Sequence, residues 1–266
     1  MRNIALTIAY DGTDWYGFQR QRAFPTVQQE LETALSKVFQ HPVEIVCAGR
    51  TDTGVHAVGQ VISFHTDNPI PIERVTWVTN RFLPDTIRIR SAKEKPAAFH
   101  ARFSASYRRY WYFIQTRSRP DPIVGRFCWQ IKSRLDIPVM ARALRSIQGK
   151  YDFSAFCHQG EPNGSPIRTI HRAQVKRWRH GVIIDVQADA FLHQMIRLMV
   201  ANTILIGTWE RPESWLEELV RSRNRHLAGK GAPPCGLFLM RIGYPPTVNP
   251  RWGSVLEKLN NEELLG

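Results

Sequence analysis

The sequence predicts an α+β protein, and three observations lead to this fold class. Segments that alternate apolar and polar residues, as strands do, are interleaved with segments of helical periodicity. The order strand, helix, strand, strand, helix, strand occurs once before residue 104 and a comparable order occurs after it. A length of 266 residues allows two such units. We therefore expect two β-α-β-β-α-β halves of the ferredoxin-like kind with mixed or antiparallel sheets, at residues 1–104 and 105–246, and a C-terminal tail at 247–266.

The elements of the first half follow from periodicity and turn chemistry. Apolar residues at every second position of 3–10 predict a half-buried strand. Thr26 and Gln29 form a capping box ahead of apolar residues at helical spacing, which predicts a helix from Val27 onward. The other expected elements of this half are strands at 43–48, 59–64 and 86–90, and a helix that Pro71 opens and that ends near Arg81.

The second half shows a comparable order of elements without a repeat of sequence. Alternation predicts a strand at 107–115, and helical periodicity predicts helices at 139–147 and about 192–206. We interpret His180 and Gly181 as a hairpin turn between two short strands. The remaining expected elements are these strands at 175–179 and 182–186, a loop at 159–169, a helix at 214–221 and a closing strand at 237–242.

The chain carries a large excess of positive charge. Its formal net charge is +13, from 36 Lys and Arg against 23 Asp and Glu. Residues 1–104 hold 12 basic against 10 acidic residues, and residues 105–266 hold 24 against 13. Such an excess repels itself unless a polyanion supplies the opposite charge, so we expect a nucleic acid partner that meets mainly the second half. The alternative, a protein that is basic and merely soluble, fits the uneven distribution less well.

Cysteine spacing and the absence of targeting signals narrow the class of protein. The apolar run at 4–10 is too short for a secretory signal, and no stretch approaches the roughly 20 apolar residues that span a bilayer. We therefore expect a protein of the reducing cytoplasm. Neither a zinc ribbon nor a disulfide framework is predicted, because the cysteines are widely spaced and form no C-x-x-C pair: Cys47, Cys128, Cys157 and Cys235.

One polar segment between two apolar strands is a candidate for chemistry. The glycine-rich dinucleotide, P-loop, zincin and serine-hydrolase motifs are all missing. What remains is Gly49-Arg50-Thr51-Asp52-Thr53-Gly54-Val55-His56-Ala57. Loops held by strands often carry catalytic groups, which makes Asp52 a candidate. In the other interpretation Asp52 caps a turn and Arg50 is its ion-pair partner, and the chemistry of these residues alone leaves the two open.

Five ordered segments resemble motifs of one enzyme family. The segment from Ala48 to Ala57 looks like the active-site signature of the bacterial tRNA pseudouridine synthase A family. The resemblance covers nearly the whole chain. The other similar segments are Tyr10-Asp11-Gly12 through Gly17-Phe18-Gln19-Arg20, the block 99–105 with Arg108-Arg109-Tyr110, the block 190–197, and Gly236-Leu237-Phe238-Leu239.

The resemblance implies an activity, a substrate and an assembly. It implies conversion of uridine to pseudouridine in the anticodon stem-loop of tRNA, around tRNA positions 38 to 40. The N-glycosidic bond would be cleaved, the uracil rotated, and the bond remade through C5, without a metal or organic cofactor. A homodimer and an RNA-binding cleft flanked by the two halves are implied as well. The chain departs from the family at Thr53, where alanine is more usual, and at Ala201, where glycine is common.

The resemblance also implies roles for five residues. Asp52 would be the nucleophile, Arg50 would help displace the target base, and Tyr110 would stack near the flipped uridine. Leu237 would line the pocket, and Arg197 would pair with the catalytic carboxylate. The roles fit the chemistry, since a nucleotide inside a stacked stem is reached only after it is extruded, and a planar guanidinium can fill the gap. An aspartate is ordinarily ionised at neutral pH, so it needs no activating base.

Taken alone, the same residues allow other interpretations. Tyr110 lies in an aromatic strand, where core packing is commoner than stacking on a ligand, and Leu237 by itself would be assigned to the core. Arg197 lies in an apolar helix, where an unpaired charge is costly, so a partner carboxylate is expected in any case.

A basic and aromatic strand follows the predicted loop. Cations interleaved with an aromatic residue such as Trp178 are typical of an RNA-binding surface, although basic strand edges also serve to prevent aggregation. A protein that binds or chaperones RNA on the same fold without catalysis is the alternative function, and it would not need Asp52. The basic residues that we predict to contact RNA are Arg168, Arg172, Lys176, Arg177 and Arg179.

Overall fold

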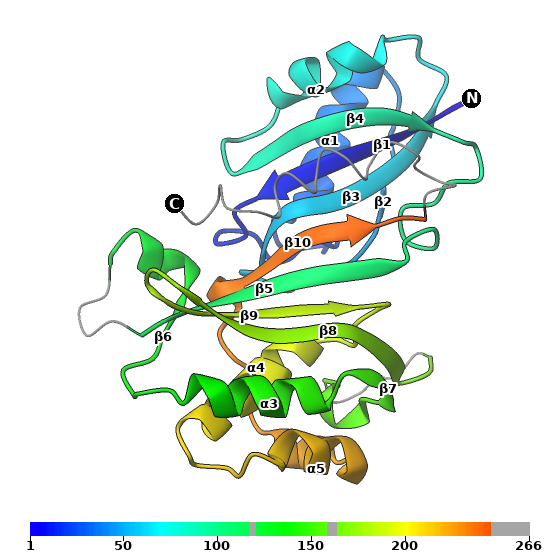
Figure 1. Ribbon diagram of the computed structural model, residues 1–266. Helices are drawn as coiled ribbons and strands as arrows, with labels where there is room; N and C mark the ends of the chain where they lie inside the picture. Colours follow the sequence, from blue (N-terminus) through cyan, green and yellow to red (C-terminus); the bar gives the residue numbers. More distant parts are fainter. Residues whose placement is uncertain (117–120, 159–163, 246–266) are drawn as a thin grey trace. The chain divides into compact units, whose positions relative to one another are not determined.

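The computed structural model describes residues 1–116, 121–158 and 164–245, which form an α+β protein of two units (Figure 1). The first unit contains Met1–Ser106 and the chain from Leu239, and the second contains Tyr107–Phe238. The first boundary therefore lies slightly later than residue 104, and the last strand of the expected second domain, 105–246, belongs largely to the first unit. The tail expected at 247–266 lies outside the described residues.

The first unit has the predicted β-α-β-β-α-β order. Strand β1 pairs antiparallel with both β3 and β4, and β2 pairs antiparallel with β3. Within this unit the strands follow the order β4-β1-β3-β10. The elements are β1 (Arg2–Tyr10), α1 (Val27–Phe39), β2 (Val46–Cys47), β3 (His56–Thr66), α2 (Ile72–Asn80) and β4 (Ile87–Lys95), with β10 (Leu237–Gly243) added from the end of the chain.

The two faces of the first sheet have different roles. On one face, the residues that alternate along β1 are fully buried, and Ile4 lies opposite Phe64 in β3. Phe64 meets Phe39 of α1 edge-on, with ring centroids 5.1 Å apart, so this face carries the helix. Ser63 points to the opposite face because side chains alternate along a strand. The face that the sequence predicts as buried is therefore the face that packs on α1.

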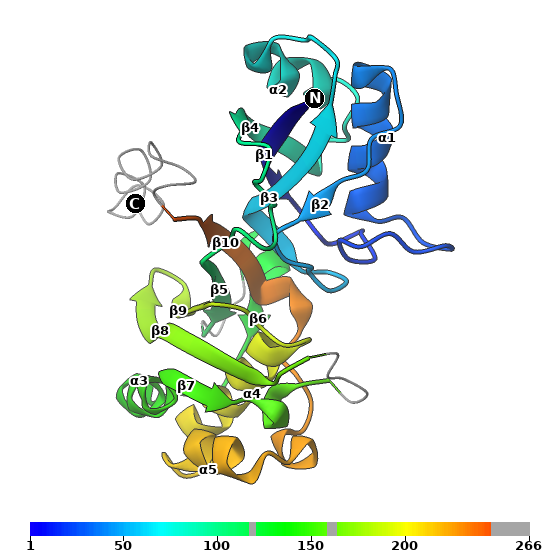
Figure 2. The ribbon, with the colours of Figure 1, turned by 90° about the vertical axis from the view of Figure 1, so that its right-hand side faces the viewer.

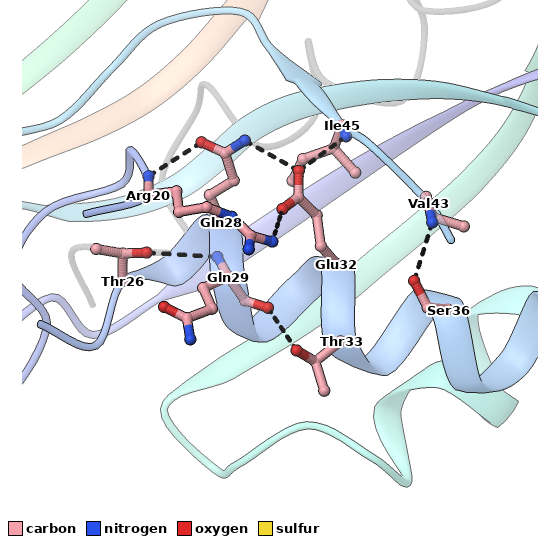
Figure 3. Close-up of polar contacts among 9 residues, drawn as sticks. All are labelled: Arg20, Thr26, Gln28, Gln29, Glu32, Thr33, Ser36, Val43 and Ile45. Atoms are coloured by element: carbon pink, nitrogen blue, oxygen red, sulfur yellow. Dashed lines mark hydrogen bonds and ion pairs between the residues drawn. The ribbon is translucent and has the colours of Figure 1, made fainter. Parts of the chain in front are cut away.

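The segment before the candidate loop is held by side chains of α1 more than by the sheet. The expected strand at 43–48 is realised only as Val46–Cys47. The amide of Val43 donates to the hydroxyl of Ser36 at 2.9 Å, and the amide of Ile45 donates to the carboxylate of Glu32 at 3.1 Å (Figure 3). These bonds satisfy backbone donors that a longer strand would have used in the sheet.

Glu32 is the centre of this polar cluster. Its carboxylate is buried, accepts a hydrogen bond from Gln28 Nε2 at 2.9 Å, and forms an ion pair with Arg20 (Figure 3). The amide of Arg20 donates in turn to Gln28. Thr26 caps the helix through its side chain, as the capping box predicts. Helix α1 therefore fixes both the N-terminal segment and the segment that enters the candidate loop.

The second unit contains a sheet in the order β5-β9-β8-β7, with β6 parallel to β5. Helices α3, α4 and α5 pack against one another and lie on the same side of β8 and β9 in both views (Figure 1 and Figure 2). The elements are β5 (Tyr107–Gln115), β6 (Trp129–Gln130), α3 (Ile137–Ser146), β7 (Gly149–Asp152), β8 (Ile167–Trp178), β9 (Gly181–Ala188), α4 (Met195–Gly207) and α5 (Trp215–Ser222), with short 3₁₀ helices at Val124–Phe127, Ser154–Phe156, Arg225–Ala228 and Pro234–Gly236.

Several expectations for the second half need correction. The hairpin turn consists of Arg179 and His180, one residue earlier than expected, because Trp178 pairs directly with Gly181. Strand β8 begins at Ile167, inside the segment expected to be a loop, and residues 159–163 of that segment lie outside the described part. Strand β5 matches its predicted range. In the described ranges, no helix is both long and apolar enough to cross a bilayer.

Candidate active site

The loop that carries Asp52 leaves β2 and enters β3, and β3 holds its first residues. The amide of Ala48 donates to the carbonyl of Val61 at 2.8 Å. The side chain of Gln60, which is fully buried, donates to the carbonyl of Gly49 at 2.5 Å. Further on, the amide of Val55 donates to the carbonyl of Asp52 at 3.1 Å and closes a turn. The backbone on both sides of Asp52 is therefore fixed by hydrogen bonds.

The N-terminal motif lies directly against this loop. The amide of Phe18 donates to the carbonyl of Thr51 at 3.0 Å. A Cβ atom at Gly17 would lie 2.9 Å from that same carbonyl oxygen, and one at Gly12 would lie 2.1 Å from the carbonyl oxygen of Val55. Gly17 also has a φ of +85°, which L side chains rarely adopt. The two glycines thus let the N-terminal backbone approach the loop closely on both sides of Asp52.

Two buried side-chain contacts join the same segments. The hydroxyls of Tyr10 and Thr51 lie 2.8 Å apart. Burial raises the pKa of Tyr10 well above its ordinary value, and the hydrogen bonds with Thr51 and Gln60 only partly offset this, so Tyr10 is a neutral structural group. Nδ1 of His56 lies 3.0 Å from the amide of Gly12 and 3.1 Å from Oδ1 of Asp11. That nitrogen accepts from the first or donates to the second, and either bond ties the end of the loop to the N-terminal motif.

The side chains of the loop differ in exposure. Asp52 is half-buried and Arg50 is exposed. Burial raises the pKa of the neighbouring Cys47 to about 11, and the charges of Arg50 and Arg102 partly oppose this rise. Two guanidinium groups therefore act on the start of the loop. The arrangement presents the half-buried carboxylate of Asp52 from a backbone fixed by hydrogen bonds, as a group positioned for chemistry requires.

The other predicted site residues belong to the second unit. Tyr110 in β5 is buried, and its ring meets that of Phe191 edge-on with centroids 5.3 Å apart. Phe191 lies in the segment that leads into α4, so the block 190–197 packs against β5. The burial of Tyr110 against an aromatic ring agrees with the interpretation of this residue as part of the core. Its edge-on contact with Phe191 was not predicted.

Arg197 lies in the first turn of α4, and Leu237 follows a short 3₁₀ helix. Nε of Arg197 donates to the carbonyl of Ala232 at 2.7 Å, and the amide of Ala232 donates back to the carbonyl of Arg197 at 2.9 Å. Its charge also lowers the pKa of Cys235, opposing the rise that burial causes. The structure thus places Arg197 beside the segment that leads directly to Leu237, which is buried.

Some basic side chains of β8 and the turn after it form ion pairs within the unit, and others are exposed to solvent. Arg177 and Arg179 are exposed, and Arg168 donates to backbone carbonyls of its own segment. Arg172 and Lys176 instead lie 3.1 and 2.9 Å from a fully buried carboxylate, that of Asp185.

The centre of that cluster was not predicted from the sequence. Arg109 makes a two-pronged contact with Asp185, at 2.8 and 2.7 Å. Burial by itself raises the pKa of Asp185, but the bonds and charges of Arg109 and Lys176 outweigh it and hold that pKa below its ordinary value. The signal in the sequence was a single acidic residue inside an apolar strand, because an uncompensated charge there would be costly.

No group of three or more His, Cys, Asp and Glu residues that could hold a metal ion occurs in the described part of the chain. Asp52 and Arg50 belong to the first unit, and Tyr110, Arg197 and Leu237 belong to the second. The expected pairing of Arg197 with Asp52 therefore stays a prediction.

Comparison with known proteins agrees with the motifs. Residues 6–104 and 143–245 match a family described as tRNA pseudouridine synthase. A relative from Pseudoalteromonas atlantica, named tRNA pseudouridine synthase A, is 42% identical over 92% of this chain and 93% of its own. Relatives of the same name from Blochmanniella pennsylvanica and Vibrio vulnificus are 39% and 42% identical, over 92% and 91% of this chain and 94% and 92% of theirs. The chain therefore belongs to the tRNA pseudouridine synthase family, a family of isomerases.

Proposed function

We propose that this protein converts uridine to pseudouridine in the anticodon stem-loop of tRNA, at positions 38 to 40, with Asp52 as the nucleophile. One structural observation supports the proposal in addition to the family match. The backbone around Asp52 is braced by β3 and by the glycines of the N-terminal motif, while its side chain stays half-buried. A tight brace around a partly accessible carboxylate is typical of a group that has to be held in position for chemistry.

The reaction balances without a redox partner. The bond between N1 of uracil and C1′ of ribose breaks while Asp52 engages the substrate. The uracil then rotates, C5 bonds to C1′, C5 loses its proton and N1 gains one. We expect no redox cofactor, because the reaction is redox-neutral, and no metal, because the His and Cys residues of the sequence show no ligand spacing.

We propose that Arg50 takes part in base extrusion. It is exposed on the loop, two residues before Asp52. A guanidinium can occupy the space that an extruded base leaves, and it can contact phosphates or base edges at the same time. We propose roles for Tyr110 against the flipped uridine, for Leu237 in the pocket and for Arg197 with the catalytic carboxylate on the basis of the family motifs.

We also propose a homodimer that binds tRNA, on the same basis. Light scattering at the concentration of the activity assay measures the mass of the active species. A fully active monomer would remove this part of the proposal.

The function is tested by mapping pseudouridine in tRNA from cells with and without this protein. We expect pseudouridine at positions 38 to 40 to disappear from the anticodon stem-loops of the cells that lack it, and to return when the wild-type chain is restored. An unchanged map, with tRNA still bound by the purified protein, would favour the non-catalytic alternative.

A further inference from the structure

A turn on the first unit is held in place by three separate parts of that unit. The amide of Ala101 donates to the hydroxyl of Ser63 at 3.1 Å, and the hydroxyl of Tyr244 donates to the carbonyl of Ala101 at 2.8 Å. The side chain of Asn3 donates to the carbonyl of Phe99 at 2.7 Å. The turn at 99–104 is therefore fixed on the sheet face opposite α1, where Ser63 points.

This rigid turn displays an aromatic ring to solvent. Phe103 is 77% exposed. Its ring stacks on that of His100, with centroids 4.3 Å apart and planes 27° from parallel. Nδ1 of His100 accepts hydrogen bonds from the amides of Arg102 and Phe103, both at 3.2 Å, so the stacking partner is itself fixed. One face of the Phe103 ring rests on His100, and most of the rest meets water.

The turn lies next to the start of the Asp52 loop. Ser63, which anchors the turn through its side chain, pairs through its backbone with Val46 of β2. The chain then runs from β2 directly into the loop. The charges of Arg102 on the turn and Arg50 on the loop both oppose the rise that burial causes in the pKa of Cys47. Phe103, Arg102 and Arg50 are all exposed, and the turn and the loop both lie near β2, the strand that leads to the proposed nucleophile.

This combination fits one kind of ligand. The Phe103 ring leaves most of its apolar area exposed although the turn is fixed, and base stacking on such a ring is favourable for any nucleobase. The guanidinium of Arg102 lies 5.7 Å from the centroid of the Phe103 ring, where it can meet the phosphate of a base that stacks there. A protein partner could bury apolar area on the Phe103 ring. The two arginines would favour its binding only if the partner were acidic.

We propose that Phe103, with Arg102 beside it, is a stacking platform for an unpaired base of the bound tRNA next to the target uridine. This inference rests on the proposed function for the identity of the RNA. It assigns to the turn a binding role, so its loss weakens tRNA affinity more than it slows turnover at saturation.

The chain offers a matched control in the same unit. Trp77 on α2 is also strongly exposed, and the guanidinium of Arg81 lies 5.1 Å from its ring centroid. It has the same pairing of aromatic and cation, on a helix that packs against β4 rather than on the turn held by Ser63. Trp77→Ala therefore removes a similar exposed ring without touching the proposed platform.

The experiment measures tRNA affinity of the full chain with a full-length tRNA transcript, for wild type, Phe103→Ala, Phe103→Leu, Phe103→Tyr and Trp77→Ala. Since stacking of a base on an aromatic ring contributes about 1–3 kcal/mol, we expect Phe103→Ala to raise Kd about 5- to 160-fold. We expect Phe103→Leu to be as weak, because it keeps apolar area but cannot stack, and Phe103→Tyr and Trp77→Ala to bind as wild type. Thermal melts of each variant show that the fold is kept.

Three results would overturn the assignment. They are unchanged affinity in Phe103→Ala, restored affinity in Phe103→Leu, and an effect of Phe103→Ala on self-association alone. The experiment measures tRNA binding, so its outcome does not depend on whether the protein forms pseudouridine. A wild-type protein that binds tRNA but forms no pseudouridine would refute the catalytic proposal and leave the comparison of Kd values able to decide the role of Phe103.

Discussion

At the scale of single residues, the candidate site depends on two glycines that carry no chemistry. Gly12 and Gly17 occupy positions where any Cβ atom would meet the backbone of residues 51–55. The Asp52 loop therefore takes its shape in part from the backbone of the N-terminal motif, which lies directly against it.

Gly17→Ala should lower turnover while it leaves tRNA affinity nearly unchanged. The substitution forces a positive φ on alanine, at a cost of about 1–3 kcal/mol, and pushes on the carbonyl of Thr51 next to Asp52. The control is Gly229→Ala, which has a φ of +63° and no atom within 4 Å of the added Cβ. We expect it to lower the melting temperature through the same kind of backbone strain, with normal turnover. Equal turnover in both variants would contradict the positioning role of Gly17.

The sequence could predict which residues of β1 face the core, and it could not predict what the glycines touch. Alternation along one strand fixes which side chains share a face, so the burial of Ile4, Leu6 and Ile8 follows from local order. The contact of Gly17 with Thr51 joins residues far apart in the chain, and only the resemblance to a family singled out that motif. The cluster around Asp185 was missed for the same reason, since its cations come from β5 and β8.

At the scale of secondary-structure elements, strands β5, β9 and β8 are joined by the buried carboxylate of Asp185. Strand β9 supplies the anion, β5 supplies Arg109, and β8 supplies Arg172 and Lys176. Two of the cations that we expected to contact RNA therefore stabilise the sheet in this structure.

Asp185→Asn should destabilise the protein by about 3–5 kcal/mol at neutral pH, because it leaves the buried guanidinium of Arg109 without its anion. The pKa of Asp185 is lowered in the folded state, so its contribution is present above the ordinary carboxyl pKa of about 4. That contribution is lost as pH falls through the lower folded value. The difference in unfolding free energy between wild type and variant, from urea titrations, should therefore shrink below about pH 4.

Glu217→Gln is the matched control for this titration. Glu217 forms an exposed ion pair with Arg221 one turn away on α5, and such pairs contribute little. A difference between wild type and Asp185→Asn that stays constant down to pH 2 would contradict the assignment.

Element positions were predicted best where a local pattern decides them. The cap at Thr26 and the strand at Tyr107–Gln115 depend on neighbouring residues, and both are confirmed. The strand expected at 43–48 was too long, because Ser36 and Glu32 of α1 take up the amides of Val43 and Ile45. Those bonds come from a different element, so no pattern within 43–48 could reveal them.

At the scale of the whole molecule, sequence order alone assigned the last strand to the wrong unit. Strand β10 closes a second run of elements along the chain, but from Leu239 onward it belongs with the first unit. Its hydrogen-bonded neighbour there is β3, more than half the chain away. Strand pairing over such separations is decided by packing and not by local sequence.

The net charge of +13 predicts a strong salt dependence of tRNA binding. Each neutralised phosphate releases counterions, so a protein that contacts six to ten phosphates loses about 10³- to 10⁵-fold in affinity between 50 and 200 mM salt. We expect a steep linear fall in a log-log plot of affinity against salt. A flat plot would show that the basic surfaces face away from the RNA.

In the proposed mechanism Asp52 performs the chemistry and does not merely hold a turn. Asp52→Asn keeps the size and hydrogen-bonding reach of the side chain and removes its charge. Asp14→Asn, at an exposed position of the N-terminal segment, is the control for loss of one negative charge.

The most direct test measures tritium release from tRNA labelled at C5 of uridine, together with a thermal melt and the Kd for tRNA on the same samples. We predict that Asp52→Asn melts and binds tRNA as wild type does and releases no tritium, while Asp14→Asn is fully active. If Asp52 were only an ion-pair partner in a turn, the variant would melt earlier and keep activity in proportion to its folded fraction. A folded Asp52→Asn variant with near-normal tritium release would contradict the proposed mechanism.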